Sequence, residues 1–356
     1  MTSSPRPAKS ASHKSSELLL AIAVLCCVAP LAAQTPVFTS FDAPHAGRNA
    51  YRGTFPTCIN QLGVIAGYYY DSLTQAHGFV RSSDGVLTEF DPTNLKMNLV
   101  TGINSRGEIV GEGAHLVGGV AIVIGFLRKP NGNFIAITLP GSVDTRLLGI
   151  NDNGQIAGEY LDAAAVLHGF LRDASGTYTV FDEPNSSGTG VSAINANGDI
   201  TGFYADAAGL AHGYIRDQFG NFTSFDPSGA MYTNPQAINL SGEVTGAYTD
   251  ANSVTRGFAR DANGVITSFE SSGSLSTFAE GMNDSGAIVG VLSENYSTYR
   301  GFERDPSGAM ASFSVVPPAT FGVAINNVAQ ITGYYVDSAH VYRGFVSSTN
   351  FVSSKK

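Results

Sequence analysis

The sequence predicts an all-β protein, a seven-bladed β-propeller made of four-stranded antiparallel blades. Three observations lead to this prediction. A short motif recurs seven times. Every copy but the last holds four short strand-like runs. The last copy lacks the fourth run, and a run of that type stands near the N-terminus instead. Repeats of about 40–45 residues that contain four short strands are typical of propellers.

Composition agrees with a strand-rich and turn-rich protein. Among 356 residues there are 41 glycines, no tryptophan and only 14% charged residues. The formal net charge is −9, and no Lys/Arg run occurs beyond the extreme N-terminus. A nucleic-acid partner is therefore not expected.

The N-terminus is predicted to be a signal peptide over residues 1–33, followed by the propeller over 34–356. Basic residues precede an apolar run over 18–33 that is too short and too proline-interrupted for a comfortable membrane span. We expect cleavage after Ala33 and a mature chain without a transmembrane span. The expected localisation is secreted or extracellular, with a periplasmic or surface-associated position as the alternative. The mature chain keeps one cysteine, Cys58, so no internal disulfide is expected.

An Ile-Asn pair, with Met in one copy, marks the repeat. The pairs lie about 44 residues apart, and we number the copies 1 to 7 by them. Their first residues are Ile59, Ile103, Ile150, Ile194, Ile238, Met282 and Ile325.

Each copy is predicted to form strands a to d, from the axis to the rim. Strand a ends at Ile-Asn, strand b resembles "IAGEY", strand c resembles "HGFLR" and strand d resembles "YTVFD". Asn-x-x-Gly joins a to b and Asp-x-x-Gly joins c to d. Both are tight-turn sequences, because the side chain accepts backbone hydrogen bonds and glycine adopts positive φ.

The two chain ends are predicted to close the ring. Residues 37–42, "VFTSFD", match a strand d, and copy 7 has no such strand of its own. We therefore expect residues 37–42 to pair with the strand at 341–346, which leaves no open edge between first and last blades.

The a–b and c–d turns should lie on one face, called here the turn face. The longer b–c and d–a connections should lie on the other, the variable-loop face, where a binding site around the channel mouth is expected. Candidate aromatic contacts, expected in d–a loops, are Tyr51, Tyr232, Phe278 and Phe321. Acids that close strand d either start turns or form a ring near the channel that attracts a cation; they are Asp42, Asp91, Asp182, Asp226 and Glu270.

A second pattern pairs an acid at the end of strand b with a base at the start of strand c. Six copies share it, so it predicts a structural pair that holds the b–c loop rather than a catalytic Asp/His couple. Copy 2 loses both partners and has His115 and Ile124 instead. The expected pairs are Asp71–His77, Asp162–His168, Asp206–His212, Asp250–Arg256, Glu294–Arg300 and Asp337–Arg343.

The predicted function is non-enzymatic binding of a protein or glycan by a monomer, without metal or cofactor. One alternative is a carbohydrate-active hydrolase or lyase, for which Glu280 and Asp144 are the non-repeating carboxylates beside strand a. Another is a structural component of the cell envelope. The sequence leaves the ligand and the oligomeric state open.

The strand c motif resembles that of the bacterial extracellular repeat proteins of the HAF family. Matching triplets are His77-Gly78-Phe79, His168-Gly169-Phe170 and His212-Gly213-Tyr214, whereas copies 5 to 7 begin with arginine. The resemblance covers all seven copies. It implies a secreted or surface-exposed bacterial protein and assigns no activity or catalytic residue.

Overall fold

The computed structural model describes residues 37–348 together with Met1. The described residues contain 28 β-strands and no helix, as the sequence predicts. No helix among them is long and apolar enough to cross a membrane. The expected signal peptide at 1–33 lies, apart from Met1, outside the described residues.

Each copy contributes consecutive short strands in the order expected. The strand before copy 1 is β1 (Phe38–Phe41). Copies 1 and 2 comprise β2 (Gly53–Ile59), β3 (Ile65–Tyr70), β4 (Ala76–Arg81), β5 (Leu87–Phe90), β6 (Lys96–Ile103), β7 (Ile109–Val117), β8 (Val120–Arg128) and β9 (Phe134–Ile137). Copies 3 and 4 comprise β10 (Asp144–Ile150), β11 (Ile156–Leu161), β12 (Leu167–Arg172), β13 (Tyr178–Phe181), β14 (Gly188–Ile194), β15 (Ile200–Ala205), β16 (Ala211–Arg216) and β17 (Phe222–Phe225). Copies 5 to 7 comprise β18 (Ala230–Ile238), β19 (Val244–Asp250), β20 (Thr255–Arg260), β21 (Ile266–Phe269), β22 (Ser276–Met282), β23 (Ile288–Asn295), β24 (Thr298–Arg304), β25 (Met310–Phe313), β26 (Ala319–Ile325), β27 (Ile331–Val336) and β28 (Tyr342–Ser347).

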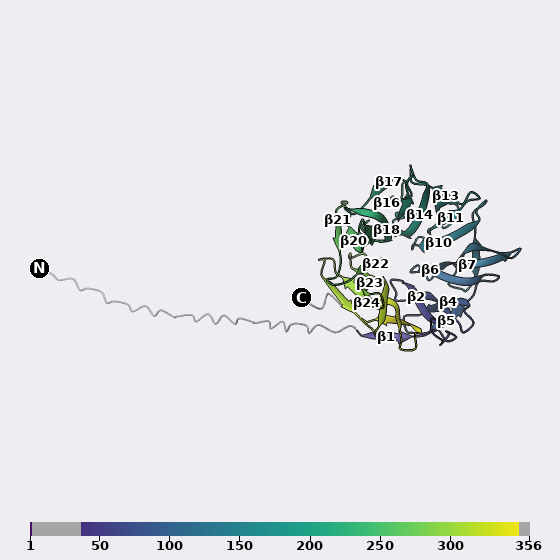
Figure 1. Cartoon of the computed structure of the whole chain (residues 1–356), viewed down its shortest axis with the longest axis horizontal. Coiled ribbons are helices and arrows are strands. Elements are labelled where there is room, and N and C mark those ends of the chain that lie inside the picture. Colours follow the sequence, from purple (N-terminus) through teal and green to yellow (C-terminus); the bar gives the residue numbers. More distant parts are fainter. Residues whose placement is uncertain (2–36, 349–356) are drawn as a thin grey trace. The chain divides into compact units, whose positions relative to one another are not determined.

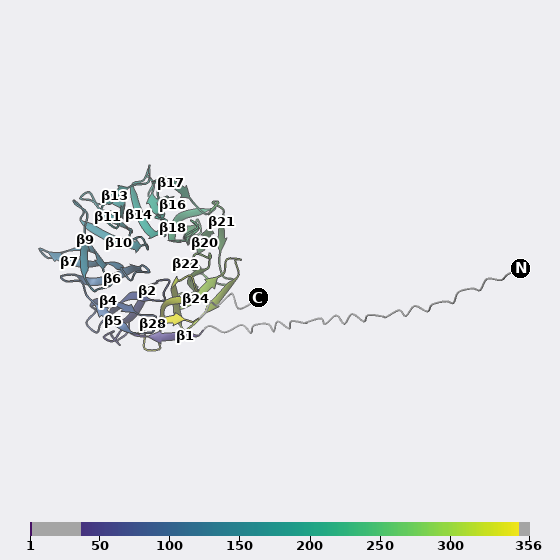
Figure 2. The ribbon, with the colours of Figure 1, turned by 180° about the vertical axis from the view of Figure 1, so that it is seen from behind.

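Copies 2 to 5 each form a separate four-stranded antiparallel sheet. The strands of copies 6, 7 and 1 join one 12-stranded sheet through the single parallel pairs Tyr299↔Ala319 and Gly53↔Tyr342. Strand β1 pairs antiparallel with β28, from Phe38↔Ser347 to Phe41↔Gly344, which is the partner that the sequence predicts. The sheets are arranged around a common centre, with strands a such as β2, β6 and β10 nearest to it (Figure 1). Figure 2 shows β1 beside β28 from behind.

The Gly-aromatic pair of strand c builds the core of every copy. The aromatic member, Phe170 in copy 3 and Tyr214 in copy 4, is fully buried. Its glycine leaves room for the strand d aromatic, because a Cβ on Gly213 would lie 2.8 Å from a ring carbon of Phe225. This packing explains why copies 5 to 7 keep Gly-Phe although they replace the histidine.

The asparagine of each Ile-Asn pair has two functions. In copy 4 the Asn195 side-chain oxygen accepts the N–H groups of Asn197 and Asp199 at 3.0 and 2.9 Å, which shapes the a–b turn. Its amide donates to the carbonyl of Asn239 in the next copy at 2.9 Å.

The same inter-copy bond occurs at every step. It runs from Asn60 through the successive copies and ends with Asn326, whose amide donates to the carbonyl of Asn60 at 3.2 Å. All seven asparagines are at most 5% exposed. The pair is therefore a contact between sheets as well as a turn signal.

Arginines that end strand c stack on aromatic rings. The Arg216 guanidinium lies 4.8 Å from the Phe181 ring of the preceding copy. Arg172 is an exception: copy 2 offers Ile137 where other copies have an aromatic residue, and Arg172 lies over Tyr178 of its own copy. These arginines thus join adjacent sheets through their planar faces.

Candidate functional site

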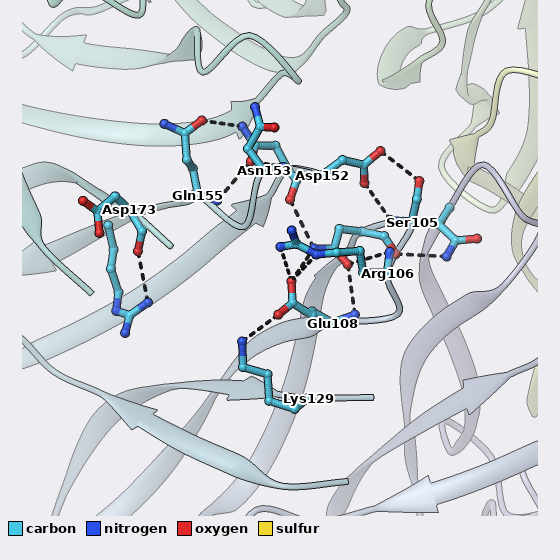
Figure 3. A network of polar contacts seen from close by, with 12 residues as sticks. Ser105, Arg106, Glu108, Lys129, Asp152, Asn153, Gln155 and Asp173 are labelled. Atoms are coloured by element: carbon cyan, nitrogen blue, oxygen red, sulfur yellow. Dashed lines mark hydrogen bonds and ion pairs between the residues drawn. The ribbon is translucent and has the colours of Figure 1, made fainter. Parts of the chain in front are cut away.

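The turn face carries a polar cavity of about 290 Å³ on the axis, lined by the Ile-Asn pairs and the residues after them. Its rim is closed by further inter-copy bonds. The N–H and hydroxyl groups of Ser105 donate to the Asp152 carboxylate at 2.7 and 2.9 Å (Figure 3). Leu240 and Asp284 make a similar bond at 2.9 Å.

Glu108 is the most strongly held acid beside this cavity. Lys129, Arg106 and Asn104 each donate to its carboxylate, at 2.6, 2.5 and 2.7 Å (Figure 3). Burial favours a higher pKa, but these hydrogen bonds, that of Lys129 foremost, lower the pKa of Glu108 to about 2. Its oxygens are saturated by the protein, so this cluster stabilises the turns and offers little to a ligand.

All six acid–base pairs expected between strands b and c are present. Asp71, Asp162 and Asp206 lie 3.6, 3.5 and 3.5 Å from their histidines. Glu294–Arg300 and Asp337–Arg343 lie at 2.6 and 2.9 Å, and Asp250 contacts Arg256. The second oxygen of most of these acids accepts two N–H groups of the b–c turn, as Asp206 does from Ala208 and Leu210. The pairs therefore anchor the b–c turns.

The acids that close strand d do not form the ring near the channel that was one of the two expectations. Each meets the strand c base of its own sheet: Asp91 and Asp226 lie 2.8 and 2.7 Å from the Nδ1 atoms of His77 and His212. Corresponding contacts join Asp182 to His168, Glu270 to Arg256 and Asp42 to Arg343. Strand d is the outer strand of each copy, so these five acids form acid–base–acid clusters towards the rim rather than a ring at the channel.

The clusters have the electrostatics of structural ion pairs. The hydrogen bond that His212 donates to Asp226 is the main cause that raises the pKa of His212, and Asp206 adds to it. The backbone N–H of Leu210 is the main cause that lowers the pKa of Asp206. Within residues 37–348, no group of three His, Cys, Asp or Glu side chains is arranged to hold a metal ion.

Two cavities flank the connection from β5 to β6, on either side of Pro92–Leu95. One, of about 520 Å³, lies against Ile124, Phe126 and Phe134 in copy 2. The other, of about 350 Å³, includes the His77–Asp91 pair. Copy 2 is where the acid–base pattern fails, and its longer β7–β8 hairpin opens this part of the variable-loop face.

Three of the four candidate aromatic residues lie in strands rather than in d–a loops, contrary to the prediction. Tyr232, Phe278 and Phe321 belong to β18, β22 and β26, because strand a begins earlier than the loop sequences indicate. Only Tyr51 lies in a loop, where it is 66% exposed and stacks on His340 at 6.0 Å. The four do not form one surface.

The structure does not bring Glu280 and Asp144 together. Asp144 is the first residue of β10 and Glu280 the fifth of β22. Strands a run in the same direction, so this offset amounts to about 13 Å of strand length, beyond the roughly 5–10 Å that separates glycosidase carboxyl groups. Asp144 accepts the N–H of Val123 at 2.8 Å and caps the β8 edge.

Glu280 lies at the bulge of β22 between Ala279 and Gly281. Its carboxyl group is partly buried, which raises its pKa. The bulge packs against copy 7, since a Cβ on Gly281 would lie 3.0 Å from the carbonyl oxygen of Val323. The pKa of Tyr334 is raised by burial first and then by neighbouring groups that include Glu280. Glu280 therefore belongs to a site with copy 7 rather than with Asp144.

Seven aromatic side chains on copies 6, 7 and 1 form a continuous group, called here the aromatic arc. Its members are Tyr299, Phe321, Tyr334, Tyr342, Phe55, Tyr68 and Tyr70. Phe55 is central, with ring centroids 5.1 Å from Tyr68, 5.7 Å from Tyr70, 5.2 Å from Tyr334 and 4.6 Å from Tyr342. Phe321 continues the group to Tyr334 at 4.8 Å and to Tyr299 at 5.4 Å.

The arc lies in the half of the sheets near the variable-loop face. Phe55 and Phe321 stand near the beginning of strand a, Tyr70 ends strand b, and Tyr342 begins strand c. Each of these positions adjoins a d–a or b–c connection. Phe55 is buried, whereas the other six side chains are half-buried and retain contact with solvent.

The tyrosine hydroxyls of the arc converge. Burial and the neighbouring Tyr70 and Tyr342 raise the pKa of Tyr68 to about 12, and Tyr68 and Tyr342 act likewise on Tyr334. Within residues 37–348 none of the arc hydroxyls has a hydrogen-bond partner. None of them is among the buried polar atoms that lack a partner, so these hydroxyls reach solvent and are accessible to a ligand.

The arc occupies positions that the repeat does not fix. Cross-strand pairs at one register of strands a and b vary from copy to copy: Phe55↔Tyr68, Leu99↔Glu112, Arg146↔Glu159, Gly190↔Phe203, Asn234↔Ala247, Phe278↔Val291 and Phe321↔Tyr334. Since glycine, alanine and asparagine serve in copies 4 and 5, the fold does not require aromatic residues here.

Copies 2 and 3 have charged side chains at the same register. Arg146 lies 3.9 Å from Glu112 and 3.6 Å from Glu159. Burial raises the pKa of both glutamates. The variable register therefore has an aromatic part and an adjoining ionic part.

Sequence reasoning did not identify the arc except for Phe321. A signal was nevertheless present in strand b, where the residue after the conserved glycine is Tyr68, Glu112, Glu159, Phe203, Ala247, Val291 or Tyr334. When one position of a repeated strand differs from copy to copy, the fold does not require a particular residue at that position.

Comparison with known proteins supports the fold. No family model and no curated protein matches the sequence. The β-propeller domain of the Trilobed protease from Pyrococcus furiosus, which has an open velcro topology, matches with a TM-score of 0.61 and 10% identity over 84% of this chain and 99% of that chain. A prolyl endopeptidase matches with a TM-score of 0.56 and 9% identity over 89% of this chain and 55% of its own. TolB from Acinetobacter baumannii matches with a TM-score of 0.50 and 11% identity over 82% of this chain and 65% of that chain.

This chain therefore has a β-propeller fold built from repeated four-stranded sheets. At such low identity the likeness concerns the fold alone.

Proposed function

We propose that the seven copies form a closed seven-bladed propeller and that the protein is a binding protein whose ligand meets the variable-loop face. Two contacts support closure: β1 pairs with β28, and the Asn326 amide reaches the carbonyl of Asn60. Both join copy 7 to the beginning of the chain, and they involve different elements.

The aromatic arc carries the proposal of a binding role. It is a half-exposed aromatic surface on positions that the fold leaves free, beside hydroxyls without protein partners. Exposed aromatic groups of this kind on a rigid scaffold are characteristic of binding sites. The acid–base–acid clusters, in contrast, recur in five copies and are satisfied by their own protein partners.

A thermal-shift panel tests the role. Oligosaccharides, peptides and quaternary amines are added to the mature protein, to the double variant Phe321→Ala/Tyr334→Ala and to Phe203→Ala, which removes an aromatic residue from the same register in copy 4. A ligand raises the melting temperature in proportion to RT ln(1 + [L]/Kd). We expect at least one class to shift the wild type and Phe203→Ala but not the arc variant. If no class shifts the melting temperature, or if the arc variant responds equally, the proposal is wrong.

Secretion and kinship with HAF-type extracellular repeats belong to the same proposal. The apolar N-terminal run and the His-Gly-Phe triplets support them. Expression of the full chain in a bacterial host, followed by N-terminal sequencing, is expected to give an extracytoplasmic product that begins at Gln34. A cytoplasmic product with an intact N-terminus would contradict secretion.

A further inference from the structure

The arrangement of the rings in the arc favours some chemical classes of ligand over others. Its rings contact one another at centroid separations of 4.6 to 5.7 Å, so the space between them is filled by the rings themselves. A cage for a quaternary ammonium needs ring faces turned to a void of that size. The arc instead presents ring edges and outer faces, a platform rather than a cage.

Hydrogen-bonding groups lie along this platform. The rings of Tyr334 and Tyr342 lie 5.7 Å apart, as do those of Tyr68 and Tyr70. Glu280 precedes Gly281, which packs against the backbone of Val323 in copy 7, and it contributes after burial to the raised pKa of Tyr334. A hydroxyl both donates and accepts hydrogen bonds, and a carboxylate accepts them. The platform therefore matches a ligand with apolar C–H faces and many hydroxyl groups at its edges.

Resting on the proposed binding role, we infer that the aromatic arc is a binding site for a neutral oligosaccharide. Phe321 stacks on Tyr299 and on Tyr334, so pyranose rings stack their C–H faces on the outer faces of Tyr299 and Tyr334, while their hydroxyls bond to tyrosine hydroxyls and to Glu280. The arc extends over three consecutive copies, which suits several linked sugar units rather than one. A polyanionic chain is disfavoured by Glu280, by Glu112 in the adjoining ionic part and by the net charge of −9.

The test is titration calorimetry of the mature protein with neutral oligosaccharides of glucose, mannose, xylose and N-acetylglucosamine. We expect at least one sugar series to bind. Tyr334→Ala should weaken its association by at least about tenfold. Tyr334→Phe keeps the ring and loses only a hydroxyl, so it should weaken association by about threefold to tenfold.

Phe203→Ala is the matched control and should bind as the wild type does, with the far-ultraviolet circular dichroism of every variant showing that it folds. Saccharide binding that is unchanged in Tyr334→Ala, or no saccharide binding at all, overturns the inference. If peptides or amines bind in an arc-dependent way while sugars do not, the ligand class is wrong and the binding role stands. If no ligand depends on the arc, both are wrong.

Discussion

The hydrogen bonds between the Ile-Asn pairs are expected to be a main connection between adjacent sheets, and Asn195→Ala tests this. Asn195 is 4% exposed and makes four hydrogen bonds. Two shape its own turn, one goes to Asp199 Oδ2 at 2.9 Å, and one crosses to the Asn239 carbonyl of the next copy at 2.9 Å.

At roughly 1 kcal/mol for each bond, with a further penalty for the buried carbonyl left without a donor, the variant should lose about 4 kcal/mol of unfolding free energy. Such a loss is a large part of the roughly 5–15 kcal/mol that is usual for a domain. Asn195→Asp retains the turn acceptor but sets a buried carboxylate oxygen against Asp199 Oδ2 and the Asn239 carbonyl, so it should lose at least as much as Asn195→Ala.

Asp261→Ala is the matched control. Asp261 accepts the N–H groups two and four residues ahead, from Asn263 and Val265, as Asn195 does in its own turn, but it makes no contact with a neighbouring sheet. Urea unfolding followed by circular dichroism measures both variants. If Asp261→Ala costs as much as Asn195→Ala, the turn explains the whole effect and the proposed connection between sheets is refuted.

Three further predictions concern the junction, the core and the rim. Phe41→Ala removes the ring beneath Arg81 and beside Phe79 and should cost about 2–3 kcal/mol in urea unfolding, whereas Thr39→Ala on the exposed side of β1 should be near neutral. Gly213→Ala brings a methyl group against Phe225 and should cost about 1–3 kcal/mol, while Gly188→Ala, whose nearest neighbour would lie 3.6 Å away, should be tolerated; equal losses would contradict the packing argument. Since the pKa of His212 is raised in the folded state, its stabilisation is fully present below the unfolded value of about 6.5 and is lost as pH rises through the folded pKa. The melting temperature of the wild type should therefore fall relative to that of His212→Gln between about pH 6 and 8, and a constant difference would argue against the histidine cluster.

The sequence predicts the strands and turns because their determinants are local and repeated. The Asx-turn bonds of Asn195 and Asp206 connect residues two and four apart, so spacing alone identifies them. The pairing of Phe38–Phe41 with β28 was predictable because a strand-d sequence stood at one end and was missing at the other. The bond from Asn195 to Asn239 was not, because it depends on where the next sheet places a carbonyl oxygen.

The candidate site was harder to predict for a related reason. Comparison of repeats identifies residues that most copies share. The acids of strands b and d are such residues, and they were therefore predicted first. Their bases pair with both acids, as His212 does with Asp206 and Asp226, so the two columns belong to one structural cluster. Four members of the aromatic arc occupy one register of strands a and b, at which only copies 1 and 7 combine Phe with Tyr, as Phe55↔Tyr68 and Phe321↔Tyr334, so a search for features common to all copies does not find them.

Within the arc, some side chains stabilise the junction between copies 1 and 7, and others are accessible to a ligand. Phe55 contacts Tyr334 and Tyr342 across the junction between copies 1 and 7, and it is 8% exposed, so its ring acts mainly as core. The hydroxyls of Tyr334 and Tyr342 make no bond within the described residues and contribute little to folding. A surface needed only to join the two copies would be filled by aliphatic side chains, as Leu99 and Val291 fill the same register elsewhere. The hydroxyl groups exceed what the junction requires, and this excess is the physical reason to assign the arc to a ligand.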